Sequence, residues 1–282
     1  MRKKYLKLIS TDSIGLLGRP EQFVYLYKNY FEDGTFNGAE AIAFRPVSKL
    51  VNLISVLKKN RIKVISLHGR TGGENLLPFI YHVMMVGVNK TLLNAKETLA
   101  NFSKKDILFH TPYSQNPLVE KMILRFPPKK LLFENHRIGK AGIDDTIKQI
   151  SYYRQKGINV FGLIDIYHYV YALPTEFIKT NWTAIVNELE KFFKLKDKKN
   201  QPYFNAVHFP IGTRLSDSLP IEEMSDQMLE LFAEKITPYL DRLVIENQVK
   251  NLGLIYSTKS MLKKQKQRNR INIKRLVKTG IL

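Results

Sequence analysis

A regular alternation of short apolar runs with longer amphipathic segments constrains this chain most. The runs have the length and β-branched composition of buried strands. We expect strands at residues 5–10, 38–44, 62–68, 106–110, 130–134, 158–165, 204–209 and 242–247. Apolar residues recur every three or four positions in the segments between them, which predicts helices such as 46–60, 144–157, 181–195 and 225–240. Strands that alternate with helices form a parallel sheet with crossover connections.

Eight predicted strands within about 250 residues favour a closed barrel over an open sheet. No G-x-G-x-x-G motif follows the first strand, which disfavours a dinucleotide-binding sheet. We therefore predict an α/β protein with a (β/α)8 TIM barrel over residues 1–258. Residues 259–282 are predicted as a basic C-terminal tail, since they hold nine lysines and arginines and no acids. The tail would either form one helix on the barrel or stay unfolded until a partner binds.

Composition limits the available chemistry. The chain has no cysteine, which excludes disulfides, thiolate nucleophiles and sulfur-bound zinc. Nitrogen and oxygen ligands remain, and these suit zinc, manganese or iron. Lys7 and Asp12 interrupt the N-terminal apolar stretch, and the longest apolar run, 76–88, is too short to cross a bilayer. We expect a cytoplasmic protein without a membrane partner.

The net charge of +20 leaves two interpretations open. A surplus of this size is typical of proteins that contact polyanions such as DNA. The alternative is a lysine-rich composition with a solvated tail.

The last six predicted strands each end in a histidine or a carboxylate. These residues are His68, His110, Glu134, Asp165, His208 and Glu246, and His168 follows three positions after Asp165. In a parallel barrel these ends converge on one mouth, where barrel enzymes place their catalytic residues. Singly, each has a structural explanation, such as an aspartate that caps the next turn. Together, the three carboxylates would repel one another without a cation, and imidazoles complete the ligand shell of a divalent metal. The pattern predicts such a metal, with zinc expected first and manganese or iron as alternatives.

Six short segments carry a resemblance to a known family. In order they read "SLHG", "LFHTP", "LFENH", "LIDIYHYVYA", "VHFPIGTR" and "LVIEN". Between residues 60 and 250 the chain resembles the xylose isomerase-like barrel superfamily, and most closely endonuclease IV within it. The resemblance implies two zinc ions held by the six strand-end residues, with Glu134 bridging them.

The chain departs from endonuclease IV at a third zinc site. That family uses the histidine after the strand-six aspartate, here His168, together with an Asp-x-His pair in the loop after strand seven. Ser216 and Ser218 stand in place of that pair, with Asp217 between them as the nearest substitute. The DNA-intercalating aromatic residue expected shortly after His68 is also missing.

Three functions are compatible with these sequence features. The one we favour is a metal-dependent phosphodiesterase that hydrolyses DNA at abasic sites, with Glu134 between two metals and Arg214 neutralising a phosphate oxygen. The alternative is a single-metal isomerase or epimerase of a sugar or sugar phosphate, in which Glu134 and Glu246 move protons while His168 and Arg214 bind substrate hydroxyls. A non-catalytic nucleic-acid-binding protein is the third.

Overall fold

A computed structural model of the chain describes residues 5–11, 19–42, 47–68, 108–112, 117–135, 139–170, 173–210, 221–246 and 259–282. Predictions for Arg214, Asp217 and the apolar run 76–88 lie outside these residues. None of the described helices combines the length and the apolar character needed to cross a membrane.

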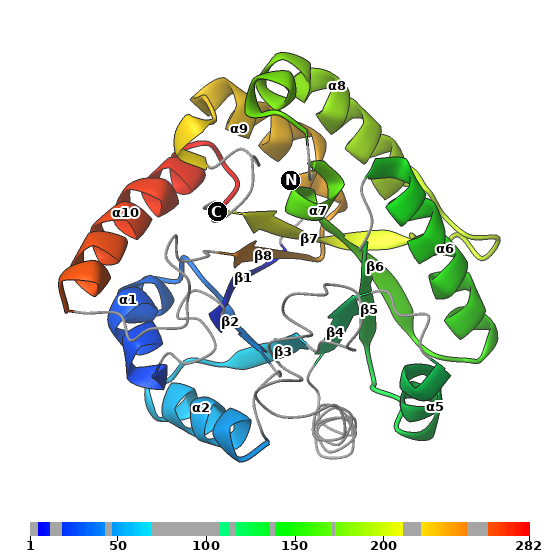
Figure 1. Cartoon of the computed structure of the whole chain (residues 1–282), viewed down its shortest axis with the longest axis horizontal. Coiled ribbons are helices and arrows are strands. Elements are labelled where there is room, and N and C mark those ends of the chain that lie inside the picture. Colours follow the sequence, from blue (N-terminus) through cyan, green and yellow to red (C-terminus); the bar gives the residue numbers. More distant parts are fainter. Residues whose placement is uncertain are drawn as a thin grey trace.

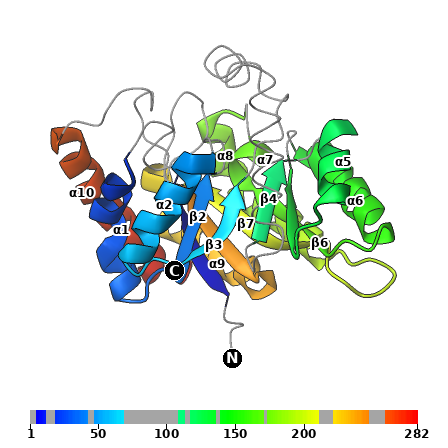
Figure 2. The same ribbon diagram turned by 90° about the horizontal axis from the view of Figure 1, so that it is seen from below.

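Eight parallel strands close into a barrel in sequence order. They are β1 (Leu6–Ser10), β2 (Gly38–Ile42), β3 (Val64–His68), β4 (Leu108–Pro112), β5 (Leu131–Glu134), β6 (Val160–Asp165), β7 (Phe204–Pro210) and β8 (Arg242–Glu246). β8 pairs with β1, which closes the ring. Figure 2 shows β2, β3 and β4 running in the same direction. The parallel α/β architecture predicted from the alternation is confirmed.

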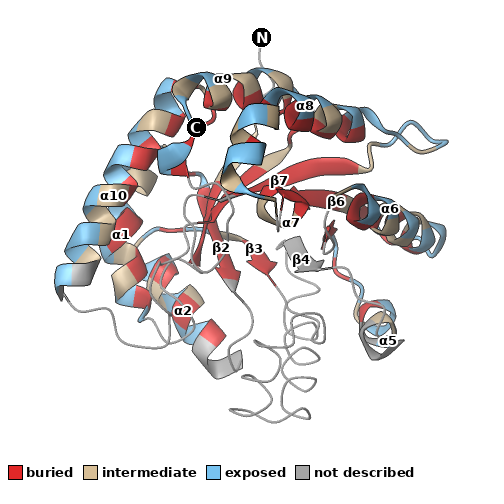
Figure 3. Ribbon diagram, turned by 45° about the horizontal axis from the view of Figure 1, so that its top comes forward, coloured by how far each residue is buried: buried red, intermediate tan, exposed pale blue. Residues whose placement is uncertain are grey.

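Helices surround the strands on the outside of the barrel (Figure 1). They are α1 (Pro20–Glu32), α2 (Val47–Lys59), α5 (Pro117–Arg125), α6 (Gly139–Gln155), α8 (Thr175–Lys194), α9 (Asp226–Lys235) and α10 (Lys259–Lys278), with short 3-10 helices η2 (Ile221–Glu223) and η3 (Thr237–Tyr239). The short helix α7 (Ile166–Val170) directly follows β6 and lies beside β7, within this ring (Figure 1). Their buried sides face the barrel and their exposed sides face outward (Figure 3).

Several predicted boundaries were wrong by a few residues. The predicted helix 225–240 ends at Lys235, and η3 follows it around Pro238, whose ring removes a backbone donor. α8 begins at Thr175, directly after Pro174, rather than at residue 181. β4 and β7 run two residues past His110 and His208, so these histidines precede the strand ends.

Strand alternation divides the buried residues into two sets. Outward residues such as Phe133, Ile164 and Val207 join the large core between sheet and helices. The inward residues Leu132, Leu163 and Ala206 form a separate cluster inside the barrel. The side chains that follow the inward set along β5, β6 and β7 therefore also lie on the barrel's inner face.

Gly162 allows β6 and β7 to approach each other closely. A Cβ atom at this position would lie 2.3 Å from the ring of Phe204. The register between the two strands shifts between Gly162 and Leu163, and after that shift Asp165 pairs with His208. The glycine thus contributes to the alignment of these two polar residues.

The basic tail forms helix α10, which lies between α9 and α1 in the outer ring (Figure 1). Ile273 and Leu276 join the main core, and the side-chain amide of Asn269 donates to the hydroxyl of Tyr27 on α1. Of the two arrangements that the sequence left open, the structure has the helix on the barrel.

Part of the positive charge of α10 attaches the helix to the barrel. Arg275 donates to Asp226 Oδ1 at 2.9 Å and to the backbone oxygen of Ile221 at 2.8 Å. Lys278 lies 2.8 Å from Asp226 Oδ2, and Arg268 pairs with Glu222. These three cations therefore already have acidic partners within the protein.

The attachment of α10 should weaken in acid. Burial raises the pKa of Glu222, but Arg268 and Asn272 outweigh it and lower this pKa below its ordinary value. A group with a lowered native pKa stabilises the fold above its unfolded pKa and loses that contribution as the pH falls through the native value. Wild type should exceed Glu222→Gln in stability at pH 7 by at most about 1 kcal/mol, because the pair is partly exposed. The difference should shrink below about pH 4.3.

Urea unfolding of both proteins at pH 7, 5 and 3.5 measures this difference, with the exposed Glu234→Gln on α9 as control. A difference between wild type and Glu222→Gln that stays constant over this range would contradict the assignment.

Candidate metal centre

Five of the six predicted ligands meet inside the mouth of the barrel. Each alternates along its strand with a residue of the outer core, so its side chain points toward the barrel axis, and each is buried. They are His68, Glu134, Asp165, His208 and Glu246. His110 lies beside His68 in the register of β3 and β4, while its side chain falls outside the described part of the structure.

His208 lies at the centre of this group. Its Nδ1 atom is 3.2 Å from Glu246 Oε1, 3.8 Å from Asp165 Oδ2 and 3.9 Å from Glu134 Oε1. One nitrogen thus faces one oxygen from each of three carboxylates, and the four residues come from four consecutive strands.

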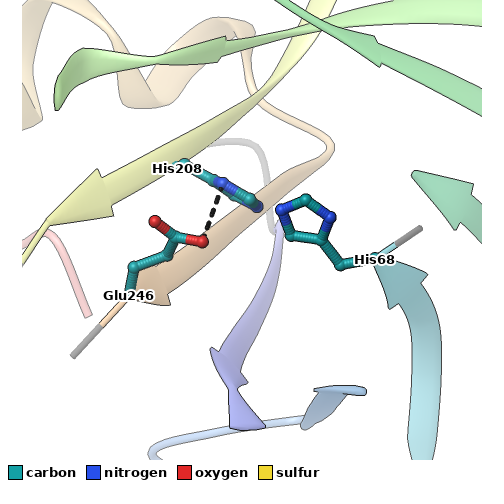
Figure 4. A group of neighbouring side chains, drawn as sticks. All are labelled: His68, His208 and Glu246. Atoms are coloured by element: carbon teal, nitrogen blue, oxygen red, sulfur yellow. Dashed lines mark ion pairs between the residues drawn. The ribbon is translucent and has the colours of Figure 1, made fainter. Parts of the chain in front are cut away.

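His68 approaches the group from β3. Its Nε2 atom lies 3.8 Å from Glu134 Oε2. Its ring and that of His208 have centroids 5.5 Å apart. Figure 4 shows both rings beside Glu246, with the contact between His208 and Glu246 marked.

The two carboxylate oxygens of Asp165 make different contacts. Its Oδ1 atom accepts the backbone N–H of His168 at 3.1 Å, which caps the first turn of α7. Its Oδ2 atom faces His208. The capping role considered for this aspartate is therefore correct, and it leaves the second oxygen directed toward the site.

Asn135 fixes the relative positions of the ends of β5 and β6. Its side-chain oxygen accepts the backbone N–H of Asp165 at 2.6 Å, and its side-chain amide donates to the backbone oxygen of Asp165 at 3.3 Å. Its own backbone oxygen lies 3.0 Å from Nδ1 of His168, which is also 3.1 Å from Glu134 Oε1. His168 thus borders the cluster. No motif marked Asn135 beyond its place in "LFENH".

Glu40 was not among the residues predicted from the sequence. This residue lies on β2 between Ala39 and Ala41, which both belong to the outer core, so its side chain is inside the barrel. It is fully buried, with Oε1 3.1 Å from Nε2 of His208. The sequence could have indicated this residue, because Glu40 is the single carboxylate within the apolar run "GAEAIAF". A charge buried in such a strand requires a compensating partner.

The carboxylates change the charge state of both histidines. Burial lowers the pKa of His168, but Asp165 and Glu134 outweigh this effect and raise the pKa to about 10. Burial likewise lowers the pKa of His208, and Glu246 and Glu40 together raise it well above the ordinary value. In the metal-free protein the imidazoles thus supply positive charge to an acidic cluster.

The donor set fits a divalent ion. Ligand atoms bound about 2.0–2.2 Å from a small divalent ion lie about 3.0–3.6 Å from one another. The three contacts of His208 Nδ1, at 3.2–3.9 Å, fall at or slightly above this range. Among the described residues, ligand atoms of His68, His208 and Glu246 lie within 4.8 Å of one another, as do those of Glu134, Asp165 and His168. Carboxylates with imidazole suit zinc, manganese and iron.

Comparisons with known proteins indicate the fold. Neither the protein-family models nor the curated proteins give a match to this chain. Among solved structures, a xylose isomerase domain protein from Alicyclobacillus acidocaldarius aligns with a TM-score of 0.50 and 11% identity, over 99% of each chain. A broad-specificity GH5-4 endoglucanase from an uncultured bovine rumen ciliate gives a TM-score of 0.54 at 9% identity, over 95% of this chain and 87% of that chain. At these identities the likenesses show a shared TIM-barrel fold alone.

A divalent ion should stabilise the folded protein. An ion that binds only the native state at a free concentration 100 times its Kd adds about 2.7 kcal/mol. We expect Mn²⁺ or Zn²⁺ to raise the Tm of wild type by several degrees. Asp165→Asn should remove most of this increase, because the amide oxygen can still cap α7 but carries no charge for the ion.

Thermal unfolding with and without Mn²⁺ checks this, with Asp145→Asn as control, since Asp145 lies on α6 and faces Lys148. An increase in Tm of the same size in Asp165→Asn and wild type would contradict the site.

Proposed function

We propose that this protein is a metal-dependent isomerase or epimerase of a sugar or sugar phosphate. The main support is the position of His208 Nδ1, which lies within 3.9 Å of an oxygen from each of Glu134, Asp165 and Glu246. These four residues would together hold one divalent ion, and one ion is enough for this chemistry. The fold likeness to a xylose isomerase domain protein agrees with the proposal.

The residues of the mouth supply acid–base groups for this chemistry. A bound divalent ion would polarise the carbonyl and hydroxyl oxygens of the sugar. Glu134 and Glu246, on β5 and β8, would remove and return a proton at the substrate carbon between them. His168, whose side chain is 23% exposed, would donate to a substrate hydroxyl, and Arg214 would do the same.

A second candidate is the two-metal phosphodiesterase resembling endonuclease IV. The two groups of three ligand atoms favour it, since each would serve one ion, and Glu134 lies within 4 Å of both His68 and His208. The net charge of +20 would suit a DNA backbone. This candidate is second because three cations of α10 already pair with acids of the same chain.

Proton exchange with solvent tests the isomerase proposal. Incubation of the Mn²⁺-loaded protein with ketohexoses and their phosphates in D₂O should place deuterium on the carbon that is deprotonated, observed by NMR. Glu134→Gln and Glu246→Gln should lower the rate by about 10²–10⁴-fold, the usual contribution of a general acid or base. Asp145→Asn should match wild type. If the loaded wild type leaves the whole panel unlabelled, the proposal fails.

Metal counting separates the two candidates. A single-metal isomerase should bind one equivalent and keep much of its activity in His68→Ala and His110→Ala. A two-metal phosphodiesterase should bind two equivalents, cleave abasic DNA and lose that cleavage in both variants, because its second ion needs these histidines. Two bound equivalents together with abasic-site cleavage would replace the first candidate by the second.

A further inference from the structure

The carboxylate of Glu40 lies inside the barrel, beneath the candidate metal centre. It comes from β2, a strand that contributes none of the predicted ligands. Glu40, Ser66 and His208 are all fully buried, and they come from three different strands. An isolated buried carboxylate is costly, so its contacts indicate why it is there.

Both carboxylate oxygens of Glu40 lie within hydrogen-bond distance of a neighbouring side chain. Ser66 Oγ donates to Oε2 at 2.7 Å, and His208 Nε2 lies 3.1 Å from Oε1. An ionised carboxylate only accepts hydrogen bonds, so the proton in the second contact belongs to Nε2 of His208. The other ring nitrogen, Nδ1, is the one that faces Glu134, Asp165 and Glu246.

We infer that Glu40 is a positioning residue for the metal centre, which holds the Nε2 proton of His208 and thereby presents Nδ1 as the ligand atom. Ser66 in turn fixes the orientation of the Glu40 carboxylate. The inference rests on the proposed metal-dependent function, because it specifies how one ligand of that site is oriented. A histidine ligand whose second nitrogen donates to a carboxylate is held in one tautomer and becomes a stronger ligand.

Packing alone does not explain an acid at this position. On the other side of the barrel interior, Leu132, Leu163 and Ala206 fill the space with apolar side chains. The charge of Glu40 also acts on Arg242 of β8: burial lowers the pKa of this guanidinium below its ordinary value, although Asp241 and Glu40 act to raise it. The barrel interior thus accommodates a carboxylate where an aliphatic side chain would pack at lower cost.

Substitution of Glu40 tests the inference through metal affinity. Calorimetric titration of the full chain with Mn²⁺ should show binding 10–100-fold weaker in Glu40→Gln than in wild type, the usual effect of losing such a partner. Ser66→Ala should give a smaller loss in the same direction, and it keeps the test valid if Glu40→Gln does not fold. Thr237→Val is the matched control, because it removes a buried hydroxyl that donates to the backbone oxygen of Ala233 on α9, away from the site.

A second readout separates positioning from a purely structural role. In the Zn²⁺-loaded, ¹⁵N-histidine-labelled wild type, NMR should show His208 protonated at Nε2, with a strongly downfield proton because a carboxylate accepts it. In Glu40→Gln this proton should move upfield, since a neutral amide oxygen is a weaker acceptor. Thr237→Val should leave it unchanged.

The outcomes distinguish the inference from the proposed function. If wild type binds neither Mn²⁺ nor Zn²⁺, the metal centre itself is rejected. If wild type binds metal and Glu40→Gln binds it as tightly, the inference alone is overturned. A wild-type spectrum with the proton on Nδ1 would also overturn the inference alone.

Discussion

Closure of a parallel barrel places charged side chains where water cannot compensate them. All eight strands point the same way, so the inward residues near their carboxyl ends share one enclosed space. Glu134, Asp165 and Glu246 meet there, and their charges must be balanced by neighbours rather than by solvent. His168 and His208 provide that balance in the metal-free protein, and a divalent ion would provide it in the loaded one.

The two sides of the barrel interior have different roles. Along β5, β6 and β7 the inward residues below the mouth are apolar and pack as a small core. Along β2 and β3 the corresponding space holds Glu40 and Ser66, which hydrogen-bond to each other. His208, on β7, contacts the polar side through its Nε2 atom.

The basic composition of this chain does not by itself indicate how much positive charge is available to a partner. Nine basic residues without an acid in the last 24 positions predict a polyanion-binding tail or a solvated one. In the structure, Arg268, Arg275 and Lys278 bind acids near α9, so part of that charge attaches a helix to the barrel. Composition could not predict this, because ion pairing depends on which residues the fold places together.

The sequence by itself determined the succession of strands and most residues of the candidate site. Each barrel strand was found from its apolar run, and five residues that meet at the mouth were found because polar residues at the ends of such runs are rare and costly. Tertiary structure alone decided that Glu40 contacts His208, since 168 positions separate them in the chain. It also decided which ring nitrogen of His208 faces the acids. The alternation of apolar and polar residues along a strand indicates on which face each residue lies. Contacts across the barrel form only when the sheet closes.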